Sequence, residues 1–234
     1  MKKLKLLFFV GMCIFTIFCF PNTEIFARAA ENDNFVDTPP SVGYTIVVDP
    51  GHGGIDPGSI GYKTKVKESE LNLKLSLMLA EKLRAVGVRV ILTRTDENSL
   101  ATGLTGKSFK KEDMKLRKAM IDKLRPNMVI SVHMNSYTNH TLRGAKVFYD
   151  KTSNISKQIA ESIQEQFSQY LEASNNVASV GDYYMLKCTA SPSVIAECGF
   201  LSNERDEQLL LDPSYQEKIV NCIFNGVINF LNLY

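Results

Sequence analysis

The most constraining stretch of this sequence is a glycine-rich turn that directly follows an apolar run. Residues 44–48 (Tyr-Thr-Ile-Val-Val) have the composition of a buried strand, and Asp-Pro-Gly-His-Gly-Gly follows at 49–54. Proline and three glycines force a tight turn, which leaves one histidine, His52, at the carboxyl end of the strand. Ligands bind at that end of open α/β sheets. His52 is therefore a candidate metal or substrate contact, although a hydrogen-bonded turn histidine would show the same pattern.

A second histidine occupies an equivalent place. The chain has only three histidines, and His133 ends another apolar run at 128–132. If the two strands are parallel neighbours, both imidazoles point into one crevice at the edge of the sheet. Neutral imidazoles that converge in this way are typical zinc ligands. The third histidine, His140, lies in a polar loop and is predicted to be a surface residue.

A catalytic zinc usually has three protein ligands and one open position, so an acid should complete the set. Glu68 is the candidate, because it stands where the loop 61–67 gives way to an amphipathic helix. A glutamate in a first helical turn can equally serve only to stabilise the helix dipole. Glu70 competes with Glu68 for the ligand role, and spacing does not separate them.

A further acid ends a later apolar run. Residues 193–196 read as a short strand that leads into Glu197, after which a glycine-containing turn leads to another helix. A carboxylate at the end of a buried strand is costly unless it is paired or used. Glu197 could be a general base that takes a proton from the attacking water, or it could form a buried ion pair. Spacing leaves both open.

The order of apolar patterns predicts an α/β fold. After residue 44 the chain alternates between strand and helix patterns, which favours a single domain with a largely parallel central sheet of about six strands flanked by helices. The segment 95–110 reads as a loop that borders the substrate cleft. The predicted strands are 44–48, 89–93, 128–133, 145–149, 183–187 and 193–197, and the predicted helices are 69–85, 111–125, 153–171, 203–211 and 215–232.

The N-terminus has the pattern of an export signal. Three lysines within the first five residues precede an apolar stretch at 6–20 and a small-residue site at 27–29. We expect residues 1–29 to be a signal peptide, or an N-terminal anchor if uncleaved. Residues 30–43 read as a linker, and 44–234 as the catalytic domain. The protein is thus expected to be exported across the cytoplasmic membrane.

Charge and cysteine content exclude some functions. The chain has 27 Lys and Arg against 25 Asp and Glu, and removal of residues 1–29 takes away four basic residues and one acidic residue. The remaining 23 and 24 charges show no basic stripe, so nucleic acid is not an expected partner. Three cysteines remain, Cys188, Cys198 and Cys222, without CxxC spacing. They are predicted to be buried free thiols.

Four separated motifs occur in an order seen in one family. They are Asp-Pro-Gly-His-Gly-Gly at 49–54, Glu68 ahead of Leu-Asn-Leu at 71–73, Ser-Val-His-Met-Asn-Ser at 131–136, and Ile-Ala-Glu-Cys-Gly-Phe-Leu-Ser-Asn at 195–203. From about residue 44 onward the chain resembles the zinc-dependent N-acetylmuramoyl-L-alanine amidases of the Amidase_3 type. The resemblance implies His52, Glu68 and His133 as Zn²⁺ ligands and Glu197 as the catalytic glutamate. It also favours Glu68 over Glu70.

The family's reaction is zinc-assisted hydrolysis of the amide bond between N-acetylmuramic acid and L-alanine in peptidoglycan. The small exported layout resembles the germination-specific, CwlD-type branch of spore formers, whose members strip peptide stems from cortex peptidoglycan ahead of muramic-δ-lactam formation. The expected location is the cell wall or spore envelope. The expected partners are peptidoglycan and an accessory activating or localising protein, with membrane contact only through an uncleaved N-terminal segment. Asn135, just past His133, is a candidate substrate contact.

Three other hypotheses about the function remain open. Another zinc peptidase or carboxypeptidase of the cell wall would use the same metal chemistry on a peptide bond. A non-catalytic peptidoglycan-binding module would need no intact site, yet all four key residues are present. A cysteine hydrolase would use Cys198 or Cys188. Arg94 and Arg117 are either structural or contacts for substrate carboxylates.

Overall fold

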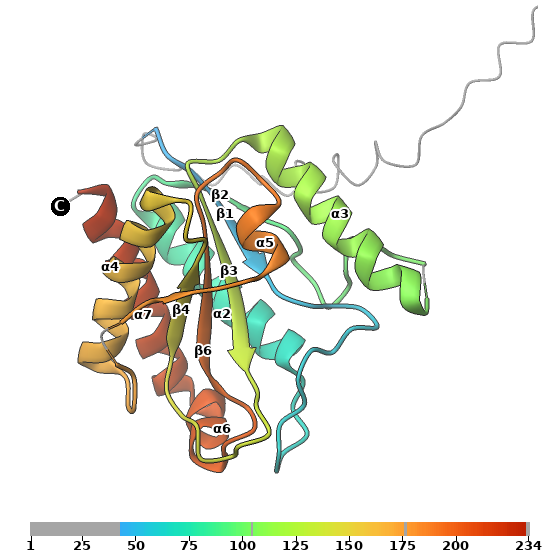
Figure 1. The fold of residues 1–234 in the computed structure, drawn as a ribbon, viewed down its shortest axis with the longest axis vertical. Helices are drawn as coiled ribbons and strands as arrows, with labels where there is room; N and C mark the ends of the chain where they lie inside the picture. The colour runs from blue at the N-terminus through green and yellow to red at the C-terminus, as the bar shows by residue number, and fades with distance from the viewer. Residues whose placement is uncertain (1–42, 104, 176, 233–234) are drawn as a thin grey trace, which may run out of the picture.

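The computed structural model describes residues 43–103, 105–175 and 177–232 (Figure 1). The predicted signal segment 1–29 and the linker 30–42 lie outside the described residues, so both assignments stay predictions. In the described part of the chain, no helix combines the length and the apolar character needed to cross a membrane.

A six-stranded sheet forms the centre of the fold. Its order is β2-β1-β3-β6-β4-β5. The first four of these strands are mutually parallel, while β4 is antiparallel to β6 and parallel to β5. The predicted single α/β domain with a largely parallel sheet is confirmed. The strands are β1 (Thr45–Pro50), β2 (Arg89–Leu92), β3 (Met128–Asn135), β4 (Lys146–Tyr149), β5 (Ser179–Val180) and β6 (Ser193–Phe200).

Helices cover the two faces of the sheet unequally, as Figure 1 shows. Helices α2, α4 and α7 pack on one face in the larger apolar core, whereas α3 and the short α5 meet the other face in a smaller cluster. The helices are α2 (Glu68–Ala85), α3 (Lys107–Leu124), α4 (Asn154–Tyr170), α5 (Tyr184–Lys187), α6 (Glu204–Leu211) and α7 (Pro213–Leu231).

The alternation of side chains along each strand explains the two cores. Ile130 and Val132 of β3 belong to the larger core, and Val129 belongs to the smaller one. Because side chains alternate between faces, His133 lies on the same face as Val129. It lies further toward the carboxyl end than any strand residue of the smaller cluster, so this end of the face is free to hold a site.

Two of the predicted element boundaries were wrong. Residues 183–187, predicted as a strand, contain the helical turn α5, and the strand of this region is the two-residue β5. Met185 and Leu186 are adjacent and both buried, which a helical turn allows and a half-buried strand does not. Helix α3 begins at Lys107 instead of 111, with buried Phe109 in its first turn, so the predicted 95–110 loop is shorter.

Candidate metal centre

The turn after β1 is held in an unusual backbone conformation. His52 has a φ of 60°, and Gly53 and Gly54 also have positive φ values. A non-glycine residue in this region is uncommon and costs free energy, so it persists only where its surroundings impose it. The amide of Gly53 donates to the carbonyl of Asp56 at 2.9 Å. The turn therefore fixes the direction in which the His52 side chain leaves the strand.

Both ring nitrogens of His52 have acidic neighbours. Nδ1 lies 2.8 Å from Oδ2 of Asp56, and Nε2 lies 3.2 Å from Oε1 of Glu68. Burial alone would lower the pKa of His52, but the hydrogen bonds and charges of Asp56 and Glu68 raise it to about 9 in the metal-free chain. The arrangement matches a carboxylate–histidine pair that leaves the second nitrogen for a metal.

Glu68, the first residue of α2, is the hub of the site and is only 2% exposed. Its Oε2 accepts from the amide of Ser59 at 2.7 Å. Its Oε1 lies 2.9 Å from Nδ1 of His133 and accepts from Asn72 Nδ2 and the amide of Met134. Burial would raise the pKa of Glu68, but hydrogen bonds and charges of the two histidines hold it far below its usual range.

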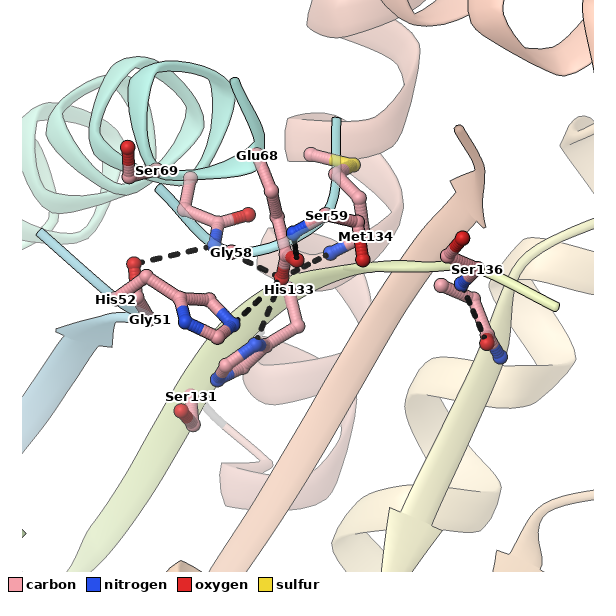
Figure 2. Close-up of polar contacts among 12 residues, drawn as sticks. Gly51, His52, Gly58, Ser59, Glu68, Ser69, Ser131, His133, Met134 and Ser136 are labelled. Atoms are coloured by element: carbon pink, nitrogen blue, oxygen red, sulfur yellow. Dashed lines mark hydrogen bonds and ion pairs between the residues drawn. The ribbon is translucent and has the colours of Figure 1, made fainter. Parts of the chain in front are cut away.

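The structure separates the two glutamates that spacing left open. Glu70 is exposed and pairs with Lys67 at 3.2 Å, which makes it a surface ion pair. Glu68 instead turns inward toward both histidines. Figure 2 shows the two imidazole rings and the Glu68 carboxylate converging from three different elements of the fold.

Two glycines make room for this convergence. A Cβ on Gly51 would lie 2.2–2.6 Å from three ring atoms of His133. A Cβ on Gly58 would lie 2.6 Å from Oε2 of Glu68 and 2.7 Å from Cδ2 of His52. Real Cβ atoms do not come this close to other heavy atoms. The glycines at both positions are thus a requirement of the site itself and not only of the turns around it.

The group His52, Glu68 and His133 has the composition of a metal centre. One ligand atom from each residue lies within 4.8 Å of the others, and the two imidazole ring centroids are 5.0 Å apart. Two imidazoles and one carboxylate are the ligand set of many catalytic zinc sites. The residues present therefore fit a metal ion.

Glu197 stands beside this group. It is the cross-strand partner of His133 in the β3–β6 register, so both side chains leave the same face of the sheet. Its Oε2 is buried and has no hydrogen-bond partner among the described residues. Burial raises the pKa of Glu197 to about 7. The described residues give Glu197 no Arg or Lys partner, so the alternative of a buried ion pair is not supported. An unpaired buried carboxylate is suited to proton transfer near neutral pH.

A β-bulge follows Glu197. The register between β3 and β6 shifts after the His133–Glu197 pair, so that Asn135 pairs with Phe200, and Gly199 has a φ of 150°. Bulges of this kind occur next to active sites, where they redirect side chains. Oδ1 of Asn135 accepts from the amide of Ser136 at 2.8 Å, and a substrate contact through Asn135 stays a prediction.

Buried arginine Arg117 supports the His52 turn from α3. It donates to the carbonyls of Pro50 at 2.8 Å and His52 at 2.6 Å, and it pairs with Asp49 and Asp113. Burial would raise the pKa of Asp49, but the charge of Arg117 and hydrogen bonds from two hydroxyl groups lower it to about 2. The network is charged and buried beneath the metal centre.

Arg94 clamps the same turn from the other side. Its Nη2 donates to the carbonyls of Gly51 at 2.9 Å and Ser69 at 2.8 Å. It thereby ties the His52 turn to the first turn of α2, which carries Glu68. The sequence left Arg94 and Arg117 as either structural residues or contacts for substrate carboxylates. Their contacts with the backbone of the His52 turn give both a structural role.

The cysteines are poorly placed for nucleophilic chemistry. Burial raises the pKa of the Cys198 thiol well above its usual range and that of Cys188 to about 11. Cys198 and Cys222 belong to the larger apolar core, on the face away from His133. All three described cysteines are free thiols, as predicted, but only Cys198 and Cys222 are buried, and Cys188 is half-buried. The cysteine-hydrolase hypothesis gains no support.

Several supporting residues were missed from the sequence. Asp56 lies four positions after His52, and Asn72 lies four positions after Glu68 on the same helix face, so local spacing could have found both. The contact of Arg117 with the His52 carbonyl spans 65 positions and had no local signal. His140 is exposed, as predicted, although its Nδ1 lies 2.6 Å from the Ser202 carbonyl.

Comparisons with known proteins point to one family. A family model described as N-acetylmuramoyl-L-alanine amidase, Amidase_3, matches residues 46–229. The germination-specific N-acetylmuramoyl-L-alanine amidase of Bacillus subtilis (strain 168) is 31% identical over 233 residues, which cover 98% of this chain and 95% of that protein. The N-acetylmuramoyl-L-alanine amidase LytC of the same strain is 30% identical over 82% of this chain and 36% of its own length.

Solved structures show the same fold. The CwlD amidase from Clostridioides difficile, solved in complex with the GerS lipoprotein, superposes with a TM-score of 0.78 and 38% identity over 82% of this chain and 100% of that chain. The catalytic domain of CwlV, an N-acetylmuramoyl-L-alanine amidase from Bacillus (Paenibacillus) polymyxa var. colistinus, gives a TM-score of 0.71 and 26% identity, with coverage of 82% and 99%.

Proposed function

The chain belongs to the Amidase_3 family of N-acetylmuramoyl-L-alanine amidases, and from this premise we propose that it is a zinc enzyme of the spore cortex. As a member of that family it hydrolyses the amide bond between N-acetylmuramic acid and L-alanine in peptidoglycan. The identity of the metal, the roles of individual residues and the biological setting are the proposed parts.

One observation carries the proposal: two histidines and a buried glutamate converge next to a second, unpartnered glutamate. We assign His52, Glu68 and His133 as zinc ligands. An N₂O donor set favours zinc over magnesium or calcium, which prefer all-oxygen sites. When bound, zinc would act as a Lewis acid that polarises the lactyl carbonyl and makes water a better nucleophile.

The chain's own residues then supply proton transfer and alignment. Glu197 takes the proton of the attacking water and returns it to the departing amine of L-alanine, so that the C–N bond breaks with a neutral leaving group. Asp56 holds the His52 ring through Nδ1, and Asn72 and Ser59 hold the Glu68 carboxylate. Asn135 belongs to this proposal as a contact for the muramoyl or the stem side of the substrate.

The cortex role is supported by the germination-specific relative from Bacillus subtilis, which this chain matches over 95% of that protein's length. We propose that the protein exposes the muramic carboxyl group from which muramic-δ-lactam is made. Export through the segment 1–29 and location in the cell wall or spore envelope belong to this proposal. The solved CwlD–GerS complex supports an accessory protein partner here as well.

Product analysis on purified peptidoglycan tests the reaction. We expect intact stems with free L-alanine amino termini, and glycan strands that keep their muramic carboxyl groups. A cell-wall zinc peptidase or carboxypeptidase would instead shorten the stems and leave L-alanine attached to the glycan. A non-catalytic binding module would release nothing.

The cortex role has its own test. The lactam ring can close only after the stem has left the muramic carboxyl group, so a deletion strain should lose muramic-δ-lactam from its cortex. Normal lactam content in that strain would reject the cortex role and leave the amidase reaction standing.

A further inference from the structure

Two adjoining cavities lie at the carboxyl edge of the sheet, beyond the metal centre. Their volumes are about 480 and 450 Å³, and both are lined by Tyr62, His140 and Ser202. We call them together the Tyr62 groove. Its walls come from three segments: the loop before α2, the loop after β3 and the turn before α6.

Two lining residues of the groove are close in sequence to residues that form the metal centre. Ile60, on its wall, follows Ser59, whose amide binds the Glu68 carboxylate. Ser136, also on its wall, lies three residues after His133. Figure 2 shows Ser59 against Glu68 and Ser136 farther along the end of β3. A substrate held over the metal centre can therefore extend into the groove without leaving the surface of the protein.

Three rings, those of Tyr62, Tyr137 and His140, stand among the mostly polar side chains that line the groove. The side chains of Tyr62 and Tyr137 are 47% and 60% exposed. The Tyr62 ring packs on the His140 ring with 4.8 Å between centroids. The amide of Tyr62 donates to the Leu201 carbonyl at 3.0 Å, and that of Tyr137 to Ser202 Oγ at 3.0 Å. The backbones that carry both rings are thus fixed, and the Tyr62 ring is also held by His140, which lowers the entropy cost of binding.

His140 adds a directed polar group. Its Nδ1 faces the Ser202 carbonyl at 2.6 Å, and because a carbonyl can only accept, Nδ1 carries the proton. In the neutral ring Nε2 is then an acceptor. The groove therefore offers ring faces, hydroxyl groups and the second ring nitrogen of His140.

Basic side chains at this surface are engaged by acids or by the backbone. Lys63 Nζ lies 5.1 Å from the centre of the Tyr62 ring and 3.6 Å from Glu204 Oε2, and Lys65 Nζ donates to the Tyr62 carbonyl at 2.9 Å. The two arginines that line it are both paired: Arg143 with Asp206 at 3.0 Å and Glu172 at 3.2 Å, and Arg205 with Glu172 at 3.1 Å. A peptide stem carries carboxylates, which unpaired arginine or lysine would recognise. A sugar ring is uncharged, with an apolar C–H face and hydroxyl groups around it.

From this lining we propose that the Tyr62 groove binds the glycan strand next to the muramic acid whose amide bond is cut. The inference rests on the proposed function, because it assigns the groove to one part of the same substrate: the sugars that extend from the metal centre. Tyr62 and Tyr137 supply stacking faces, and His140 with Ser202 receives sugar hydroxyl groups. The groove sets a preference for long glycan strands over short muramoyl peptides.

Direct binding tests the proposal without any need for turnover. Stem-free glycan strands of several disaccharides, with their muramic carboxyl groups converted to methyl amides so that the probe is uncharged, are titrated into the purified full chain by calorimetry. Tyr62→Ala and Tyr137→Ala should each raise the Kd about tenfold, through loss of one aromatic contact. Tyr62→Phe should bind as wild type, because it keeps the ring face. Tyr170→Ala is the matched control, since Tyr170 is 55% exposed at the end of α4, outside the groove.

Kinetics provide the second readout. With stem-bearing strands, Tyr62→Ala should raise KM with kcat unchanged, and with a one-sugar muramoyl peptide both constants should stay near wild type. Unchanged glycan binding in both alanine variants would overturn the proposal. So would displacement of the glycan by free stem peptide, or an equal KM rise on both substrates. Failure of the wild type to release stems while it still binds glycan would instead count against the proposed function alone.

Discussion

His133 and Glu197 are cross-strand partners at the carboxyl ends of the parallel strands β3 and β6. One faces Glu68 through Nδ1, and the other keeps a buried carboxylate oxygen without a partner among the described residues. The sheet register thus places the proposed metal ligand and the proposed general base side by side with no flexible loop between them. The apolar contacts of α3 and α5 with this face lie toward the other end of the strands.

Replacement of Glu197 by Gln should separate proton transfer from metal binding. The amide keeps the size of the side chain but cannot take a proton, so kcat on peptidoglycan should fall about 10²- to 10⁴-fold. Zinc content and melting temperature should stay near wild type. Glu217→Gln, at an exposed position of α7, is the control and should keep full activity. Near wild-type turnover in Glu197→Gln would show that the acid is structural.

Asp56→Asn should weaken metal binding. Asp56 holds Nδ1 of His52, and loss of such an orienting carboxylate typically costs about 10- to 100-fold in metal affinity. Competition with a chromogenic chelator measures the affinity, and excess zinc should restore most of the activity. Asp122→Asn, on the exposed side of α3, controls for loss of a surface carboxylate. Equal zinc affinity in the two variants would show that Asp56 does not contribute to metal binding.

A methyl group at Gly58 should damage the site itself. In Gly58→Ala the new Cβ would meet Glu68 and His52, and the residue would also have to keep a φ of 68°. Gly103→Ala is a matched control, because Gly103 has a φ of 80° but nothing within 4 Å of its Cβ. Both variants share the backbone strain, so only Gly58→Ala should lose zinc affinity and activity. The same zinc affinity in both variants would mean that Glu68 and His52 tolerate the extra carbon atom.

The buried pair of Asp49 and Arg117 predicts a dependence of stability on pH. The folded-state pKa of Asp49 is about 2, below its ordinary value of 3.8, so the unfolded chain takes up the proton first as the pH falls. The stabilisation, about 2 kcal/mol, is fully present above pH 4 and is lost as the pH falls toward 2. Urea unfolding of the chelator-treated protein between pH 5 and pH 2 measures it.

Asp49→Asn is the comparison for that measurement. It should be less stable at pH 7 by about 3 kcal/mol, because Arg117 loses one of its two buried carboxylates. Its free energy of unfolding should fall less steeply below pH 4 than that of the wild type. Parallel curves would place the acid sensitivity in other carboxylates.

Sequence reasoning reached the strand-end residues because their signal is local. His52, His133 and Glu197 each follow an apolar run, and the carboxyl ends of parallel strands meet at one edge. The choice between Glu68 and Glu70 needed the family resemblance, since both occupy the first turn of α2. Only the fold shows the physical difference, in which one carboxylate is buried among amide donors and the other pairs with Lys67.

The remaining features depend on tertiary contacts. Arg117 reaches the His52 carbonyl from a helix 65 positions away, and no periodicity in α3 marks that role. The run at 183–187 has apolar and aromatic residues typical of a strand, yet it is too short for its period to decide, and packing of Met185 and Leu186 made it helical. The Tyr62 groove likewise joins three loops that are distant in sequence.

Zinc content measured together with activity tests the central claim most directly. Wild type, His133→Ala and Glu197→Gln are dialysed against zinc, analysed for bound metal and assayed on purified peptidoglycan with and without chelator. The account predicts one zinc per chain in wild type and Glu197→Gln, little in His133→Ala, and activity only in zinc-loaded wild type. Full zinc occupancy in His133→Ala, or chelator-resistant activity in the wild type, would contradict it.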